Sequence, residues 1–231
     1  MIKAIIFDFD HTLYDRDATY DKMFLPLMDE LADYIDDTVP KEELLRRLKQ
    51  ADKDGHIGAW PTVYKKNVES GIFRVVPTFE VFLQAVRRHH PSAIVLWDDT
   101  LSTLDTLRKE GYKLGILTNG GIKAQQDKLS HTPVVPYFDA VIIAEMLPHG
   151  KPHATAFHAI CERLGVLPSE AAYVGDHPLN DIEGAKKAGL TAIWIPYAPY
   201  PDGYLKPDHT ITKLGELPEL IKKINKSPQT V

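Results

Sequence analysis

The feature that most restricts how this chain can fold is an apolar run that ends abruptly in acidic residues. Residues Ala4–Phe7 are four consecutive apolar side chains, a pattern typical of a short strand buried on both faces. Asp8 and Asp10 follow this run at i, i+2 spacing. Open α/β sheets bind their ligands at the carboxyl ends of their strands. Two bare carboxylates about 4 Å apart repel by roughly 1 kcal/mol in water and about 4 kcal/mol at an effective dielectric constant of 20, so we expect a positive charge beside them.

The remainder of the chain has two different patterns. From residue 97 onward, apolar runs alternate with amphipathic helical segments, which predicts an α/β core: a Rossmann-like parallel sheet with helices on both faces. Residues 16–96 carry apolar side chains at helical spacing, which predicts an inserted all-helical domain. We therefore expect a core of residues 1–15 and 97–231 and a helical insert of residues 16–96.

Individual elements follow from the same patterns. After the insert, strands are expected at Lys113–Leu117, Ala140–Ala144, Ala171–Val174, Thr191–Ile195 and His209–Ile211. Two of the expected helices are 24–35 in the insert and Leu179–Ala188 in the core, the latter stopped by Gly189.

Polar residues follow three of these later strands. Thr118 and Asn119 precede two glycines at a helix start, where a hydroxyl, an amide and backbone N–H groups can bind an anion. Lys151 lies before a proline that begins the next helix. Asp176 ends a predicted buried strand, and Asp181 lies in the first turn of the helix that follows. Each feature alone has an ordinary structural explanation, such as a tight turn, a solvated lysine or an acid that complements a helix N-terminus.

In combination, these residues resemble the four motifs of the haloacid dehalogenase-like (HAD) superfamily of phosphohydrolases. The matching residues, in the family's order, are Asp8/Asp10/Thr12, Thr118, Lys151 and Asp176/Asp181. The resemblance covers residues 1–15 and about 97–225, and the insert resembles the family's helical cap. It implies an Mg²⁺-dependent phosphomonoester hydrolase that acts on a small soluble phosphorylated metabolite through an aspartyl-phosphate intermediate.

The resemblance also implies the catalytic and metal-binding roles. Asp8 would be the nucleophile. Asp10 would protonate the leaving oxygen and then take a proton from the attacking water. Asp8, the backbone carbonyl of Asp10, and Asp176 would hold Mg²⁺, an ion that prefers hard oxygen ligands.

The remaining motif residues would bind the phosphate or support the site. Thr118, Asn119 and Lys151 would bind phosphate oxygens, and Lys151 would also offset the negative charge around Asp8. Asp181 would orient Lys151 or a metal-bound water, and Thr12 is expected as a second supporting residue.

Asp10 distinguishes between branches of the family. Haloacid dehalogenases lack a carboxylate two residues after the nucleophile and need no metal, so the presence of Asp10 favours a phosphatase. A phosphomutase or other phosphotransferase of the same fold stays open on these motifs, and so does a phosphonatase. A protein of another class, which binds a phospholigand without catalysis, is the second hypothesis, although every polar group needed for turnover is present.

Composition excludes several other functions. The chain has 231 residues and a formal net charge of −5, which argues against a nucleic-acid-binding protein that acts through a broad basic surface. No apolar run approaches the ~18 residues of a membrane span, and no signal peptide is recognised. The single cysteine, Cys161, is expected to be a buried structural thiol. We expect a cytoplasmic protein whose partner is a small phosphorylated substrate, and the sequence leaves its oligomeric state open.

Overall fold

The chain divides into a sheet unit and a helical unit. The computed structural model describes residues 1–55, 59–197 and 199–226. The sheet unit consists of Met1–Asp15 and Leu96–Val231, and the helical unit is Arg16–Val95. Leu96, which the sequence analysis assigned to the insert, belongs to the sheet unit because it forms an antiparallel bridge with Tyr14.

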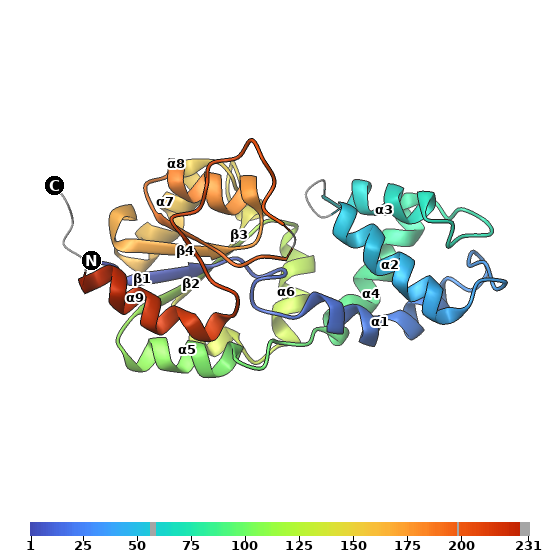
Figure 1. Ribbon diagram of the computed structural model, residues 1–231, viewed down its shortest axis with the longest axis horizontal. Coiled ribbons are helices and arrows are strands. Elements are labelled where there is room, and N and C mark those ends of the chain that lie inside the picture. Colours follow the sequence, from blue (N-terminus) through green and yellow to red (C-terminus); the bar gives the residue numbers. More distant parts are fainter. Residues whose placement is uncertain (56–58, 198, 227–231) are drawn as a thin grey trace. The chain divides into compact units, whose positions relative to one another are not determined.

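The sheet unit contains a parallel sheet of six strands within the described residues, in the order β3-β2-β1-β4-β5-β6 (Figure 1). The strands are β1 (Ala4–Phe7), β2 (Lys113–Thr118), β3 (Ala140–Ile143), β4 (Ala171–Gly175), β5 (Thr191–Trp194) and β6 (His209–Thr210). All paired strands run parallel, so the predicted α/β fold with a Rossmann-like parallel sheet is confirmed. β1 lies between β2 and β4, and all four of its side chains are buried, as its apolar run requires.

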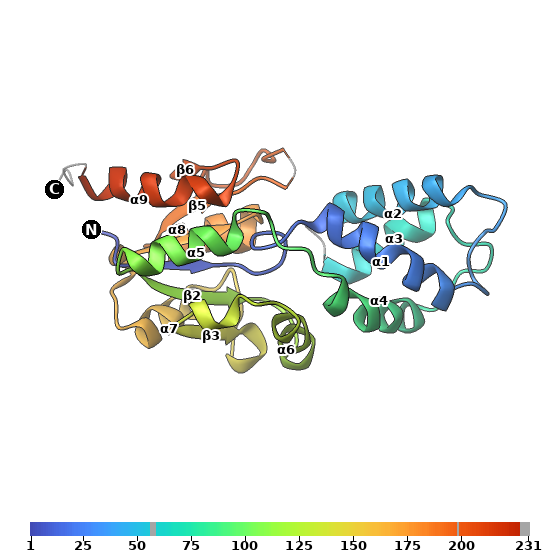
Figure 2. The ribbon, with the colours of Figure 1, turned by 90° about the horizontal axis from the view of Figure 1, so that it is seen from below.

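Helices cover both faces of this sheet. They are α5 (Thr100–Lys109), α6 (Ile122–Ser130), α7 (Ala154–Leu164), α8 (Gly184–Lys187) and α9 (Leu217–Lys226). Figure 1 shows α5 and α9 on one side of the sheet and α7 and α8 on the other, and Figure 2 looks onto the face that α5 and α9 cover. On the α7 face, Ala4 and Ile6 of β1 pack in one apolar cluster with Phe157 and Ile160 of α7. Cys161 is a buried free thiol in that cluster, and burial raises its pKa to about 11, as befits a structural residue.

The helical unit has an apolar core of its own. Its helices are α1 (Arg16–Glu30), α2 (Lys41–Gly55), α3 (Ala59–Glu69) and α4 (Phe79–Ala93). The core contains Met23, Leu27, Leu48 and Phe82 among others. The helix predicted over 24–35 begins earlier and ends at Glu30. The last residues of the predicted helix are not helical, because Ile35 is buried and forms an antiparallel bridge with Phe73.

None of the helices in the described part of the chain combines the length and the apolar character needed to cross a bilayer.

Candidate active site

Three predicted site residues lie at the carboxyl ends of neighbouring strands. Phe7, the last residue of β1, is in register with Ile116 of β2 and Val174 of β4. Asp8 follows β1, Thr118 ends β2 and Asp176 follows β4, so the parallel register brings the three to one edge of the sheet. All three are buried, which places polar groups in a site of low polarity where charge interactions are strong.

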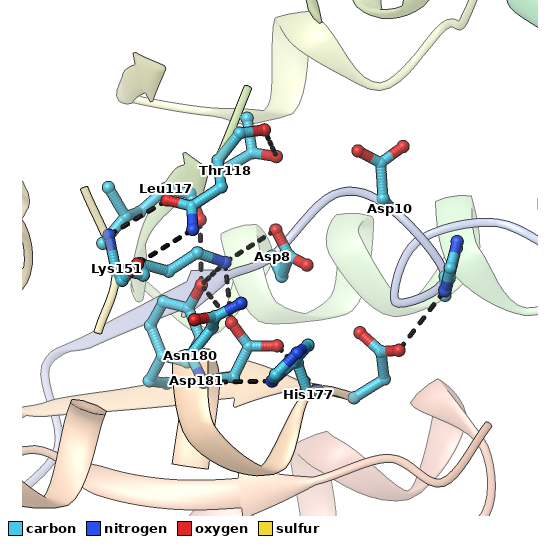
Figure 3. A network of polar contacts seen from close by, with 12 residues as sticks. Asp8, Asp10, Leu117, Thr118, Lys151, His177, Asn180 and Asp181 are labelled. Carbon is cyan, nitrogen blue, oxygen red and sulfur yellow. Dashed lines mark hydrogen bonds and ion pairs between the residues drawn. The ribbon is translucent and has the colours of Figure 1, made fainter. Parts of the chain in front are cut away.

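Lys151 lies at the centre of this edge (Figure 3). Its Nζ is 2.9 Å from Asp8 Oδ1 and 2.6 Å from Asp181 Oδ1, and it donates a hydrogen bond of 2.8 Å to the hydroxyl of Tyr173. That hydroxyl in turn donates to the carbonyl of Leu117 at 2.8 Å. The side chain of Lys151 is only 2% exposed. The structure therefore brings one buried ammonium between the two acids, Asp8 and Asp181, that the sequence analysis linked to it.

Burial and charge shift the pKa values in opposite directions at this centre. Burial raises the pKa of Asp8 to about 8, with Lys151 opposing the shift and Asp181 and Asp176 adding to it. Burial also lowers the pKa of Lys151, but Asp181 and Asp8 outweigh it and raise that pKa above its ordinary value of 10.5. Lys151 is thus a permanent cation, and Asp8 needs further positive charge nearby to be fully ionised at neutral pH.

The loop that carries Lys151 is held by Asn119. The side-chain amide of Asn119 donates to the Lys151 carbonyl at 2.9 Å, and its Oδ1 accepts from the Lys151 backbone N–H at 3.0 Å. Gly150 allows this approach, because a Cβ there would lie 2.8 Å from Asn119 Oδ1. Both ends of the Asn119 amide thus bind Lys151, whereas the sequence analysis expected a phosphate ligand. A phosphate contact from Asn119 stays a prediction.

Gly175 makes room for Asp181. A Cβ on Gly175 would lie 2.5 Å from Asp181 Cγ. The helix predicted over Leu179–Ala188 is a π-helical segment, η5 (Pro178–Glu183), followed by the single turn α8. The ring Nδ1 of His177 accepts hydrogen bonds from the backbone N–H groups that open η5, and the His177 N–H donates to Asp181 Oδ2 at 2.9 Å. Because His177 caps the start of η5, the Asp181 carboxylate is available to pair with Lys151.

Three buried carboxylates form a candidate cation site. One oxygen each from Asp8, Asp176 and Asp181 lies within 4.8 Å of the others. Both oxygens of Asp181 already accept hydrogen bonds, from Lys151 and from the His177 backbone. Asp8 and Asp176 are therefore the better carboxylate ligands, and their hard oxygens suit Mg²⁺.

The Asp10 side chain lies apart from that cluster, as Figure 3 shows. Its Oδ1 accepts from the Tyr14 hydroxyl at 2.8 Å and pairs with Lys128 Nζ at 2.5 Å, and its Oδ2 accepts from Gln125 Nε2 at 2.8 Å. Burial raises the pKa of Asp10. The Lys128 ammonium and the neighbouring His11 side chain outweigh burial and hold this pKa well below its ordinary value of 3.8. In this arrangement Asp10 is ionised, which is the form that accepts a proton.

Gln125 and Lys128 are site residues that the sequence analysis missed. They lie one turn apart on α6, the helix that begins just after Thr118. The usable signal was the i, i+3 spacing of an amide and an ammonium on a helix that starts at the ligand-binding edge of the sheet. The expected positive charge beside Asp8 and Asp10 is in fact two separate lysines, Lys151 for the first acid and Lys128 for the second.

The turn after Asp10 brings in two further residues. His11 has φ 64°, the left-handed region that histidine enters more readily than most residues. Its Nδ1 lies 3.4 Å from Asp176 Oδ2. Thr12 is fully buried, and its hydroxyl has no hydrogen-bond partner within the described residues. A supporting role for Thr12 stays a prediction.

Comparison with known proteins gives a consistent result. Residues 5–195 match the family model of the haloacid dehalogenase-like hydrolases. A glyceraldehyde 3-phosphate phosphatase of Methanopyrus kandleri is 29% identical, over 98% of this chain and 100% of that protein. The pyrophosphatase PpaX of Bacillus mycoides is 25% identical, over 97% of this chain and 99% of its own length.

Solved structures are similar over nearly the whole chain. A HAD phosphatase from Thermococcus onnurineus is 30% identical with a TM-score of 0.60, and covers 95% of this chain and 98% of its own. The putative HAD-hydrolase YfnB from Bacillus subtilis has a TM-score of 0.75 at 21% identity, over 95% of this chain and 98% of its own, which is a likeness of fold.

Proposed function

This chain belongs to the haloacid dehalogenase-like hydrolases, and from that premise we propose that it hydrolyses phosphomonoesters of small metabolites with the help of Mg²⁺. The observation that carries the proposal is the contact of Lys151 with both Asp8 and Asp181, with Asp176 beside them. The buried carboxylate supplies the nucleophile that phosphoryl transfer needs, and the permanent cation beside it supplies the charge that binds the phosphate.

The reaction follows from the groups at this edge. Asp8 attacks the substrate phosphorus, and the bond from phosphorus to the leaving oxygen breaks. Asp10, which is ionised in the structure, would first take up a proton from solvent and then deliver it to that oxygen. The product of this step is an aspartyl-phosphate on Asp8. A water then attacks the same phosphorus and gives a proton to Asp10, and the bond between phosphorus and Asp8 breaks to release phosphate. Lys151 and Thr118 would hold the phosphate oxygens during both steps.

The donor set fits Mg²⁺. Asp8, Asp176 and the backbone carbonyl of Asp10 would hold the ion, which would supply positive charge to the phosphate oxygens and to Asp8. The raised pKa of Asp8 supports this assignment, because a cation at Asp8 favours the ionised nucleophile. Asp181 would orient Lys151 and would not bind the ion, since both Asp181 oxygens already accept hydrogen bonds.

We assign substrate choice to the helical unit Arg16–Val95, acting as the family's helical cap. The names of the relatives make a triose phosphate and inorganic pyrophosphate the first compounds to test. A cytoplasmic location is part of the proposal, and the buried free thiol of Cys161 is compatible with it.

Hydrolysis of p-nitrophenyl phosphate tests the proposal. Wild type should turn over with Mg²⁺, lose activity in EDTA and recover when Mg²⁺ is restored, and Asp8→Asn should have no measurable turnover. A panel of phosphorylated metabolites then identifies the substrate. Full activity in EDTA would contradict the metal assignment. Transfer between two positions of a sugar phosphate without phosphate release would mean a phosphomutase, and phosphate binding without turnover would mean a non-catalytic protein.

A further inference from the structure

One amide on α6 contacts both halves of the reaction machinery. Gln125 Nε2 lies 2.8 Å from Asp10 Oδ2, 2.9 Å from Thr118 Oγ1 and 2.6 Å from the Asn119 carbonyl oxygen. The residue is 2% exposed. The sites that would transfer the proton and bind the phosphate are therefore joined through one buried side chain.

The orientation of this amide is determined by its partners. A carboxylate oxygen and a carbonyl oxygen can only accept hydrogen bonds, so Nε2 and not Oε1 must face Asp10 and Asn119. Oε1 of Gln125 is left buried without a hydrogen-bond partner within the part of the chain that the structure describes. A buried unpaired acceptor costs stability. The amide therefore satisfies the acceptors around Nε2 at the cost of an unpaired Oε1.

The amide also limits what the Thr118 hydroxyl can do. Nε2 of Gln125 has two hydrogens for three acceptors, so one hydrogen is shared, and because Nε2 cannot accept a hydrogen bond, the Thr118 hydroxyl must use its own proton elsewhere. Its one acceptor among the described residues is the Asn119 carbonyl, at 3.4 Å, near the limit of a hydrogen bond. A phosphate oxygen at the sheet edge can take that proton. Gln125 thus prepares Thr118 as a donor to an anion.

Lys128 controls the other oxygen of Asp10. Its ammonium pairs with Oδ1, which also accepts from the Tyr14 hydroxyl. With Gln125 on Oδ2, donors from two elements hold both oxygens of the carboxylate, so its plane cannot rotate freely.

We propose that Gln125 and Lys128 are positioning residues, in which Gln125 orients the Thr118 hydroxyl and the Asp10 carboxylate together and Lys128 restrains Asp10 alone. This inference rests on the proposed phosphatase reaction. Gln125 should influence both phosphate binding and the chemical step, whereas Lys128 should influence the chemical step only.

Gln125→Met tests the first half, because methionine keeps the side-chain length and removes the amide donors. Loss of a neutral hydrogen bond to Thr118 should raise KM for p-nitrophenyl phosphate and Kd for inorganic phosphate about three- to tenfold. Loss of the bond to the charged Asp10 should lower kcat about ten- to a hundredfold. The control is Gln126→Met, the exposed neighbour on the same helix, which should stay within about twofold of wild type.

Lys128→Met tests the second half. It should lower kcat and leave Kd for phosphate unchanged, and Lys128→Arg should recover most of the lost kcat because it restores a cation. The matched control is Lys123→Met, since that lysine lies on the same helix with its side chain 90% exposed. An increase in phosphate Kd in Lys128→Met as large as in Gln125→Met would overturn the separate roles.

A double variant separates positioning from a general structural effect. If Gln125 acts on phosphate through the Thr118 hydroxyl, Gln125→Met should add nothing to the phosphate Kd of Thr118→Val. Additive effects on Kd would overturn the inference. Melting temperatures identify variants that fold poorly, and Gln125→Asn, which retracts the amide by one methylene, then replaces Gln125→Met. Absence of turnover in the wild type would contradict the proposed function. The phosphate affinities of the variants would still decide whether Gln125 orients Thr118.

Discussion

Removing the charge of Lys151 should destabilise the protein by an amount that depends on pH. The Lys151 ammonium lies 2.9 Å from Asp8 and 2.6 Å from Asp181, and all three side chains are buried. Coulomb's law at an effective dielectric constant of about 20 gives roughly 6 kcal/mol for each contact, from which the cost of burying the ammonium must be subtracted. Removing one partner of a buried ion pair typically costs about 3–5 kcal/mol. We therefore expect Lys151→Met to lose about 3–5 kcal/mol of unfolding free energy near pH 8 in metal-free buffer.

The dependence on pH follows from the raised pKa of Asp8. The pKa is about 8 in the folded protein and about 3.8 in an exposed carboxyl, so between these values the folded state binds a proton that the unfolded chain has released. Stability from this group is complete below pH 3.8 and is lost as pH rises through 8. Without Lys151 the pKa rises further, so the difference between wild type and variant should be smaller at pH 6, where Asp8 is protonated in both, than at pH 9.

Urea unfolding of the metal-free protein at pH 6, 8 and 9 measures the effect, with Lys109→Met as control. Lys109 pairs with Asp105 at 2.6 Å, but its side chain is 74% exposed, so its loss should barely change the midpoint at any pH. Lys151→Met should also lower turnover about 10²–10³-fold with Mg²⁺ present, because it removes a charge at the phosphate. The reasoning would be refuted if Lys151→Met lost no more unfolding free energy than the control, or lost the same amount at pH 6 and pH 9.

Three further predictions concern neighbouring residues. Asp176→Asn should remove the rise in melting temperature that Mg²⁺ causes in wild type, which differential scanning fluorimetry measures without any turnover; an unchanged rise would exclude Asp176 as a ligand. Gly175→Ala should cost about 1–3 kcal/mol of unfolding free energy and reduce kcat, because its Cβ would lie 2.5 Å from Asp181 Cγ; wild-type stability would show that Asp181 has room to move. A single turnover in ¹⁸O-water with enzyme in excess should label the released phosphate and leave the peptide that carries Asp8 unlabelled, and label in that peptide would indicate attack on the carboxyl carbon, as in a dehalogenase.

The order of polar residues along the chain carried most of the information about the site. Asp8, Thr118 and Asp176 each end or follow an apolar strand, and parallel neighbours bring their carboxyl ends together whatever the details of packing. The apolar pattern alone therefore predicted the parallel sheet and the edge at which the acids gather. The pairing of Lys151 with Asp8 was predicted from the family's motifs, and the structure has the two atoms 2.9 Å apart.

Side chains on helices and in strand interiors were not predictable in this way. Gln125 and Lys128 have the composition of a solvated helix surface, and Tyr173 has that of an apolar strand position. Each became part of the site because a neighbouring element brought an acceptor to it: Asp10 for the two α6 residues and the Leu117 carbonyl for Tyr173. Asn119 was assigned to a phosphate from its place in a motif, but its amide is bound on both sides by the Lys151 backbone.

The sequence by itself determined the strands, their parallel arrangement and the acidic edge, because these depend on hydrophobic periodicity and on which residues end each strand. Only the tertiary structure decided that Lys151 serves Asp8 while Lys128 serves Asp10, and that the Gln125 amide joins Asp10 to Thr118. The reason is physical: periodicity fixes the face on which a side chain lies, whereas a hydrogen bond depends on distances of about 3 Å between atoms far apart in the chain, and packing alone sets those distances.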